Sequence, residues 1–203
     1  MENYIDEFED VVTSIYGVYL MSMQGFHRLV EELLKLQLMT VDKFKITEPE
    51  HASVQYLDSL VYIFGKGDPN LPNSIELYRC TQGEYKERNS EKGINSRSVG
   101  NMCVIAIYQY WEDYFRQKIA NLLNRTNKNE LASDIMGDLK ILRRSIIHHR
   151  GIALKEVENC KLLRWFKEGD DIFIDKDMMK DIIFQVKSYL RALRGEVQKS
   201  LSE

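Results

Sequence analysis

Proline is nearly absent from this chain, and the few prolines are confined to one stretch. The 203 residues include only three of them, Pro49, Pro69 and Pro72. Proline lacks a backbone donor and clashes with the preceding turn, so no other residue stops a helix as effectively. The sequence before and after this stretch is therefore free to be helical, and we expect an all-α fold.

Apolar residues recur at three- and four-residue steps along several segments, which is typical of amphipathic helices. The pattern predicts helices over residues 6–39, 52–64, 102–123, 129–148 and 176–199. Together they predict a helical bundle of four or five main helices, in a single domain that covers residues 1–203. Gly151 follows the fourth of these helices at the place where a left-handed cap would end it.

Two segments do not carry a helical pattern. Residues 81–100 are polar and almost without apolar side chains, so we expect a long, exposed and mobile loop there. Residues 163–174 hold two short apolar runs around Lys167-Glu168-Gly169-Asp170. This arrangement fits a small β-hairpin, and it fits a helix end followed by an extended segment nearly as well.

The composition is that of an ordinary globular protein, with 44% apolar and 29% charged residues. The acidic start MENYIDEFED has no secretory signal pattern, and no apolar run approaches the roughly 18 residues that span a bilayer. Cys80, Cys103 and Cys160 lack the spacing of a disulfide framework or a zinc site. We therefore expect a soluble, cytoplasmic protein that has no metal, no cofactor and no membrane contact.

Sequence motifs of several enzyme classes are missing. Gly65-Lys66-Gly67 lacks the Gly-Lys-Ser/Thr ending of a phosphate-binding loop. The chain has no Gly-x-Ser-x-Gly elbow, no His-Glu-x-x-His pair and no dinucleotide fingerprint. His27 and His51 are isolated, and a surface or core position explains each of them better than catalysis does.

Positive charge is concentrated around the end of the fourth predicted helix, although the net charge of the chain is −3. Such a cluster can bind an anion even on an acidic protein. It can equally be a solvated helix face, in which cations near the C-terminus each gain about 0.3–1 kcal/mol from the helix dipole. Against only Glu156 and Glu158, residues 140–164 contain the basic residues Lys140, Arg143, Arg144, Arg150, Lys155, Lys161 and Arg164.

The run Arg143-Arg144-Ser145-Ile146-Ile147-His148-His149-Arg150 combines arginines and histidines at this helix end. Arginine offers a rigid fork of donors that matches phosphate oxygens, and histidine exchanges a proton near neutral pH. Together they supply the charge stabilisation and proton transfer that phosphodiester cleavage needs. RNA carries its own nucleophile, the 2′-hydroxyl, so the reaction requires neither a metal nor a protein nucleophile.

An arginine, four further residues and a histidine near a helix end resemble the Arg-x4–6-His motif of the HEPN superfamily. HEPN proteins are small α-helical domains, many of which are metal-independent RNA endonucleases. The resemblance covers residues 102–153, where the preceding predicted helix suits the neighbouring helix of such a bundle. The residue after the motif arginine is commonly small and polar in that family, whereas here it is Arg144. The repeated residues also allow a second register, Arg144 with His149.

The resemblance implies an endoribonuclease that cleaves RNA by 2′-hydroxyl attack. Arg143 and His148 would be catalytic, while Arg144, His149 and Arg150 would bind RNA. It also implies a homodimer in which two motifs line one cleft. This would unite residues that lie about 140° apart around an ideal helix, unless the helix unwinds near His148. Such proteins often act as toxins or in phage defence, which implies an antitoxin or another protein partner.

Two other functions fit the same residues. A non-catalytic HEPN-like or generic helical module would bind RNA, a nucleotide or a protein partner through the basic surface without cleaving anything. A purely structural interaction domain would use the basic run only to cap its helix. RNA binding without cleavage would identify the first, and the absence of both RNA binding and dimerisation would identify the second.

Overall fold

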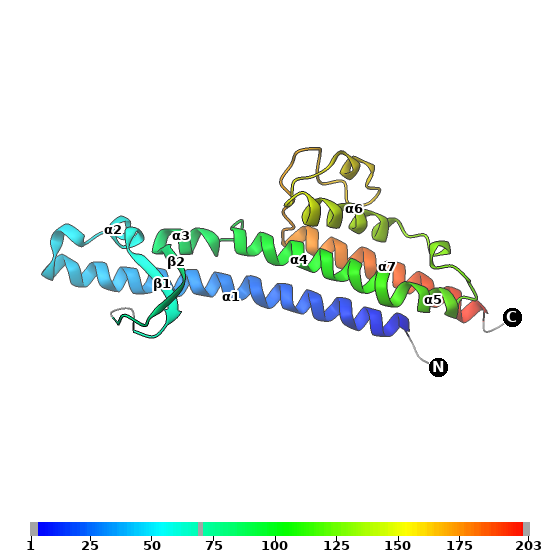
Figure 1. The fold of residues 1–203 in the computed structure, drawn as a ribbon, viewed down its shortest axis with the longest axis horizontal. Coiled ribbons are helices and arrows are strands. Elements are labelled where there is room, and N and C mark those ends of the chain that lie inside the picture. Colours follow the sequence, from blue (N-terminus) through cyan, green and yellow to red (C-terminus); the bar gives the residue numbers. More distant parts are fainter. Residues whose placement is uncertain (1–3, 69–70, 201–203) are drawn as a thin grey trace. The chain divides into compact units, whose positions relative to one another are not determined.

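A computed structural model describes residues 4–68 and 71–200 of the chain (Figure 1). The chain divides into two compact units, unit 1 formed by Met1–Met21 with Arg97–Glu203 and unit 2 formed by Ser22–Ser96. The predicted predominance of helix is confirmed in both. Among the described residues, no helix is both long enough and apolar enough to cross a membrane.

Unit 1 contains the start of the long helix α1 (Tyr4–Thr47) and the helices that follow residue 96. The helix predicted over 102–123 exists but begins earlier, that over 176–199 is confirmed, and that over 129–148 begins only at Asp134. The elements after α1 are α4 (Ile94–Tyr110), the π-helical turn η2 (Trp111–Phe115), α5 (Arg116–Leu122), the 3-10 turn η3 (Lys128–Glu130), α6 (Asp134–His148), the 3-10 turn η4 (Lys155–Asn159) and α7 (Lys176–Ser200).

Aromatic side chains from three elements meet in the core of unit 1. The Phe8 ring centroid lies 5.6 Å from that of Trp111 and 5.0 Å from that of Phe115. The Trp111 ring in turn lies 5.6 Å from that of Tyr189 on α7. The start of α1, the η2 turn and α7 therefore run side by side, as Figure 1 shows. Leu139 and Leu142 are fully buried and bind α6 to this bundle.

Unit 2 contains the rest of α1 together with a small β-hairpin and short helices. The helix predicted over 6–39 is confirmed and continues to Thr47. After α1 come the 3-10 turn η1 (Pro49–His51), α2 (Val54–Ser59), β1 (Val61–Lys66), β2 (Ile75–Thr81) and α3 (Gln82–Arg88). The two strands pair antiparallel, with Val61 opposite Thr81. A Cβ on Gly65 would lie 2.5 Å from the carbonyl oxygen of Ile75, so the bulge after Phe64 needs glycine.

The helix predicted over 52–64 is wrong beyond Ser59. Val61-Tyr62-Ile63-Phe64 belongs to β1, because β-branched and aromatic residues favour a strand when a partner strand is available. That partner, β2, begins at Ile75, after a stretch of sequence that contains two of the three prolines. The three- and four-residue spacing of apolar residues in this segment therefore does not come from one helix. Some of these residues belong to the short helix α2 and the others to the strand β1.

The long loop predicted over 81–100 is also wrong. Thr81 and Glu84 form a capping box, in which the Glu84 backbone N–H donates to Thr81 Oγ1 at 3.1 Å and the Thr81 backbone N–H donates to Glu84 Oε2 at 2.7 Å. This cap starts α3, and α4 begins at Ile94. Tyr85, whose ring stacks on that of Tyr62, is the only aromatic or aliphatic residue of α3, so the hydrophobic pattern did not predict this helix.

Residues 163–174, all of which the structure describes, form no hairpin strands. Asp171 makes an isolated bridge with Ile152, and the segment is otherwise irregular. Leu163, Ile172 and Ile174 are nevertheless buried. The apolar runs that suggested strands therefore anchor an irregular segment to the core.

Candidate functional site

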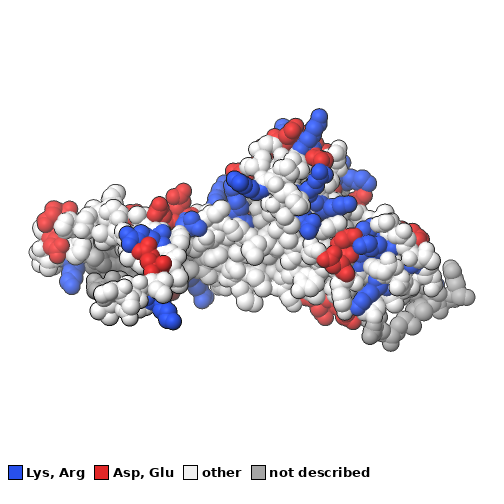
Figure 2. Space-filling view, in the orientation of Figure 1, with Lys and Arg blue, Asp and Glu red and all other residues white. Residues whose placement is uncertain are grey.

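The basic cluster of residues 140–164 lies on α6 and on the irregular segment that follows it. Figure 2 shows Lys and Arg side chains gathered over the part of unit 1 that Figure 1 draws as α6 and this segment. Only two acidic residues, Glu156 and Glu158, belong to the same stretch of sequence. The cluster therefore forms a local basic surface on a chain whose net charge is −3.

Two caps set the limits of α6. At its start the Ser133 side chain accepts a hydrogen bond from the Met136 backbone N–H at 3.4 Å. At its end the backbone N–H groups of His149 and Gly151 both donate to the carbonyl oxygen of Ser145, at 3.1 and 3.2 Å. Gly151 has a φ of +82°, so the predicted left-handed cap is confirmed. The helix continues as far as His148 and does not unwind before it.

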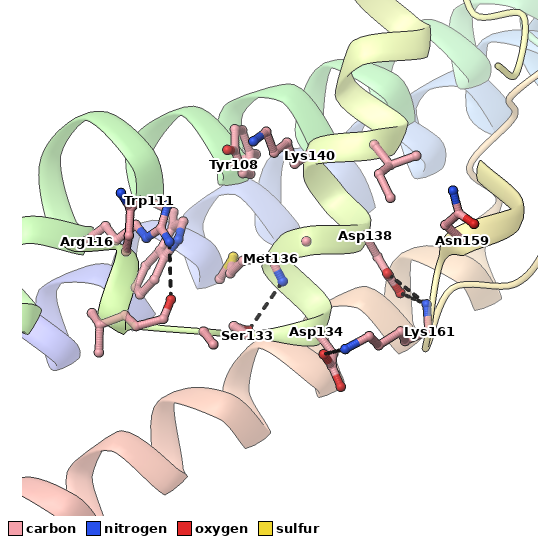
Figure 3. A pocket seen from close by; sticks show the side chains of 15 residues that line it. Tyr108, Trp111, Arg116, Ser133, Asp134, Met136, Asp138, Lys140, Asn159 and Lys161 are labelled. Atoms are coloured by element: carbon pink, nitrogen blue, oxygen red, sulfur yellow. Dashed lines mark hydrogen bonds and ion pairs between the residues drawn. The ribbon is translucent and has the colours of Figure 1, made fainter. Parts of the chain in front are cut away.

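Two polar side chains of α6 hold the segment that follows the helix. The fully buried Ser145 Oγ accepts a hydrogen bond from the Leu154 backbone N–H at 3.1 Å. The carboxylate of Asp138, only 2% exposed, accepts hydrogen bonds from the backbone N–H groups of Lys161, Leu162 and Leu163, the shortest at 2.7 Å. Figure 3 shows the Asp138 side chain directed at residue 161. These bonds fix where the segment leaves the helix.

Arg143 is half-buried and held by two residues of α4. Its Nη2 donates to Gln109 Oε1 at 2.8 Å, and its guanidinium carbon lies 5.7 Å from the ring centroid of Tyr108. Gln109 Nε2 donates to Asp113 Oδ2. Because arginine can only donate and a carboxylate can only accept, this chain fixes the orientation of the Gln109 amide. Arg143 Nε is buried and has no partner among the described residues.

His148 lies on the last turn of α6 and is exposed. It lines a hollow of about 320 Å³, here named the His148 hollow. Within the described chain, no hydrogen bond or ion pair involves its imidazole. An imidazole in this setting can form a hydrogen bond with a ligand. The hollow is lined by Tyr108, Gln109, Glu112, Asp113, Lys140, Arg143, Arg144 and His148.

The hollow unites some of the predicted site residues and leaves others out. Arg143, Arg144 and His148 all line it, whereas His149 and Arg150 are exposed and do not. Arg144 also makes a surface ion pair with Glu156, at 3.2 Å. Arg143 and His148, which would lie about 140° apart around an ideal helix, thus both reach the same hollow within one subunit.

The acidic residues of the hollow already have partners. Glu112 forms ion pairs with Arg116 at 2.9 Å and Lys128 at 2.7 Å. Burial alone would raise the pKa of Glu112, but hydrogen bonds and charge from Lys128 and Arg116 outweigh burial and lower it. Asp113 accepts from Gln109. Lys140, in contrast, is exposed and has no hydrogen bond or ion pair in the described part of the chain.

Sequence reasoning assigned no role to Tyr108 or Gln109, and it counted Lys140 only as one cation of the basic cluster. Gln109 precedes Arg143 by 34 positions, so no local spacing connects them. The sequence did predict the helix over residues 102–123, which contains Tyr108 and Gln109. Its apolar spacing does not show which polar residue of that helix contacts Arg143. Among the described residues, no group of three or more His, Cys, Asp or Glu side chains could hold a metal ion.

Comparison of the chain with protein-family models, curated proteins and solved structures finds no match. The resemblance to HEPN domains therefore rests on the motif residues and their place at the end of a helix.

Proposed function

We propose that this protein is a metal-independent endoribonuclease of HEPN type. The observation that carries the proposal is that Arg143, Arg144 and the exposed His148, which has no hydrogen bond or ion pair within the described residues, line one hollow. The hollow lies on a basic surface, which attracts a polyanion. A phosphate placed there would meet fixed cationic donors and an imidazole that can accept or donate a proton.

The reaction is an attack by the RNA 2′-oxygen on the adjacent phosphorus. The bond from the 2′-oxygen to phosphorus forms, and the bond from phosphorus to the 5′-oxygen breaks. Neutral His148 accepts the proton of the 2′-hydroxyl, and the resulting imidazolium donates a proton to the departing 5′-oxygen. Arg143 neutralises the charge that grows on the phosphate oxygens, and Arg144 orients the strand. The products are a 2′,3′-cyclic phosphate and a 5′-hydroxyl.

The proposal includes a homodimer whose two α6 ends face one cleft, and a role as a toxin or phage-defence effector. Both parts are taken from the HEPN resemblance. In a two-fold dimer each motif meets its own copy, so a second His148 would be available for the proton transfer. A basic RNA-binding surface is also what an acidic antitoxin would cover.

The test replaces His148 with alanine in the full chain. Because His148 is exposed and unpaired, we expect the variant to stay folded, while RNA cleavage falls by about a hundred-fold or more. Cleavage is measured on labelled single-stranded RNA, with mass spectrometry of the ends to identify the cyclic phosphate. His149→Ala is the matched control, because the neighbouring histidine lies outside the hollow. Full activity of His148→Ala would overturn the assignment, and loss with His149→Ala alone would select the other register.

A mixture of two inactive variants shows whether each active site is formed within one subunit or shared between the two subunits of a dimer. If Arg143 of one subunit acts with His148 of the other, mixing Arg143→Ala with His148→Ala protein restores an intact site in the mixed dimer. If both act within one subunit, mixing restores nothing. Sedimentation of the mixture shows independently whether dimers form.

A non-catalytic RNA-binding module is the second candidate. It is favoured by the contacts of Arg143, whose guanidinium is already engaged by Gln109 and lies over Tyr108. An arginine held in this way can serve packing alone. Salt-dependent RNA binding by the native protein, without any cleavage products, would select this candidate over the nuclease.

A further inference from the structure

A second hollow lies beside the first along α6. It has a volume of about 420 Å³ and lies between α6, the segment from Tyr108 to Arg116, and the start of the segment after η4 (Figure 3). Tyr108 and Lys140 line both hollows, so the two meet there. The second hollow is named the Gly137 hollow, after a residue in its wall.

The charged side chains that line the Gly137 hollow have partners within the described chain, with one exception. Arg116 pairs with Glu112, and Lys161 pairs with Asp134 at 2.6 Å. Asp138 is buried, and its carboxylate accepts hydrogen bonds from backbone N–H groups. Lys140, at the junction with the His148 hollow, keeps an unbalanced positive charge within the described chain.

The rest of the lining suits an uncharged, flat, polar-edged group. Tyr108, Trp111 and Met136 supply buried apolar wall, while Asn129 and Asn159 supply side-chain amides at the rim. Amide groups of this kind form hydrogen bonds with the edges of unstacked RNA bases. The volume lies within the range of roughly 300–1,000 Å³ that is usual for small-ligand sites.

We propose that the Gly137 hollow binds the nucleoside one position beyond the two that flank the cleaved bond of single-stranded RNA, with Lys140 contacting the phosphate that links it to its neighbour. This inference rests on the proposed function, because it places the cleaved bond in the His148 hollow. It makes Lys140 a substrate-binding residue and gives the enzyme an extended site along α6. It also predicts that a longer RNA binds more tightly than a dinucleotide, which fills the His148 hollow alone.

Gly137 offers a way to fill this hollow without disturbing its neighbour. A Cβ built on Gly137 meets no atom within 4 Å, and the residue lies in the first turn of α6. A leucine side chain there would enter the Gly137 hollow and leave Arg143 and His148 unchanged. Gly195 of α7 also has open space around its Cβ but lines neither hollow, so Gly195→Leu is the matched control.

The experiment measures RNA binding in the His148→Ala background, so that cleavage does not interfere. Fluorescence anisotropy follows a labelled, mixed-sequence RNA of about 12 nucleotides and a labelled dinucleotide. We expect Gly137→Leu and Lys140→Gln to weaken binding of the longer RNA roughly ten-fold, and Lys140→Gln to lower the salt slope by about 0.7. Gly137→Leu should leave dinucleotide binding unchanged, and Gly195→Leu should change neither affinity.

Unchanged binding of the longer RNA by both Gly137→Leu and Lys140→Gln would overturn the inference. Failure of the proposed function gives a different pattern. In that case native protein cleaves no RNA, whatever these two variants do to binding. Thermal unfolding of each variant separates a lost contact from a lost fold, and Lys140→Gln, at an exposed position, keeps the test open if Gly137→Leu folds poorly.

Discussion

Asp138 and His148 lie on the same helix and meet opposite surroundings. Asp138 is buried, and its carboxylate is bonded to three consecutive backbone N–H groups. His148 is exposed, and no hydrogen bond or ion pair of the described chain involves it. The carboxylate oxygens of Asp138 are already occupied by hydrogen bonds within the fold. The ring nitrogens of His148 remain available to a ligand.

The difference separates polar residues that build the site from those that act in it. A buried carboxylate with all its partners in place stabilises structure, because its hydrogen bonds repay the loss of water. An exposed histidine without a partner contributes little to stability and keeps both ring nitrogens for a ligand. Arg143 is intermediate, since it is half-buried but keeps donors beyond the one that Gln109 accepts.

The largest effect on stability is expected at Asp138. Asp138→Ala leaves the backbone N–H groups of residues 161–163 without an acceptor, and that of Leu163 is buried. We expect a loss of about 3 kcal/mol in the free energy of unfolding, because hydrogen bonds to a charged acceptor are the strong ones. Urea denaturation followed by circular dichroism measures the change.

Asp134→Ala is the matched control for this prediction. Asp134 lies one turn earlier on α6, and its ion pair with Lys161 is exposed to solvent. Its loss should cost less than about 1 kcal/mol. If Asp138→Ala were no less stable than Asp134→Ala, the contrast between a structural and a free polar residue on α6 would be wrong.

Residues with local signals were predicted well from the sequence. The apolar spacing of α1, α6 and α7 predicted these helices, and Gly151 predicted the left-handed cap, because each is decided by neighbours within a few positions. The helix over 52–64 and the loop over 81–100 failed for a common reason. β1 depends on pairing with β2 across a turn, and α3 depends on the Thr81 cap rather than on an apolar face.

The candidate site shows the same division between local and distant signals. Arg143 and His148 are noticeable in the sequence because they lie close together near a helix end. Gln109 and Tyr108 are not, because their contact with Arg143 arises only when α4 packs against α6. Lys140 was visible as a cation, but only the fold places it in the walls of both hollows.

A smaller effect, on activity, is expected at Gln109 if the proposed function holds. Gln109→Leu removes the acceptor that positions Arg143, so we expect kcat for RNA cleavage to fall roughly ten-fold while KM changes little. Gln109→Glu keeps an acceptor for Arg143 and should recover part of the loss. A purely structural role of Gln109 would instead lower thermal stability and leave kcat of the folded protein unchanged.

The smallest effect concerns the pH dependence of stability at Glu112. Its partners Lys128 and Arg116 lower its pKa below the ordinary value of 4.5, despite the opposing effect of burial. The stabilisation by charged Glu112 is therefore fully present above pH 4.5 and is lost as pH falls through the lowered pKa of the folded state. Glu112→Gln should cost up to about 1 kcal/mol at neutral pH, because both ion pairs are partly exposed.

Urea unfolding of the native chain and of Glu112→Gln, from neutral pH to about pH 3, measures this difference. It should shrink as pH falls, because the native chain then also carries a neutral side chain at position 112. Glu91→Gln is the control, since Glu91 is exposed and has no ion pair in the described chain. A Glu112→Gln variant that is more stable than the native chain at neutral pH would mean that Glu112 is destabilised by its charge. That would place it with His148 among the residues left for a ligand, rather than with Asp138.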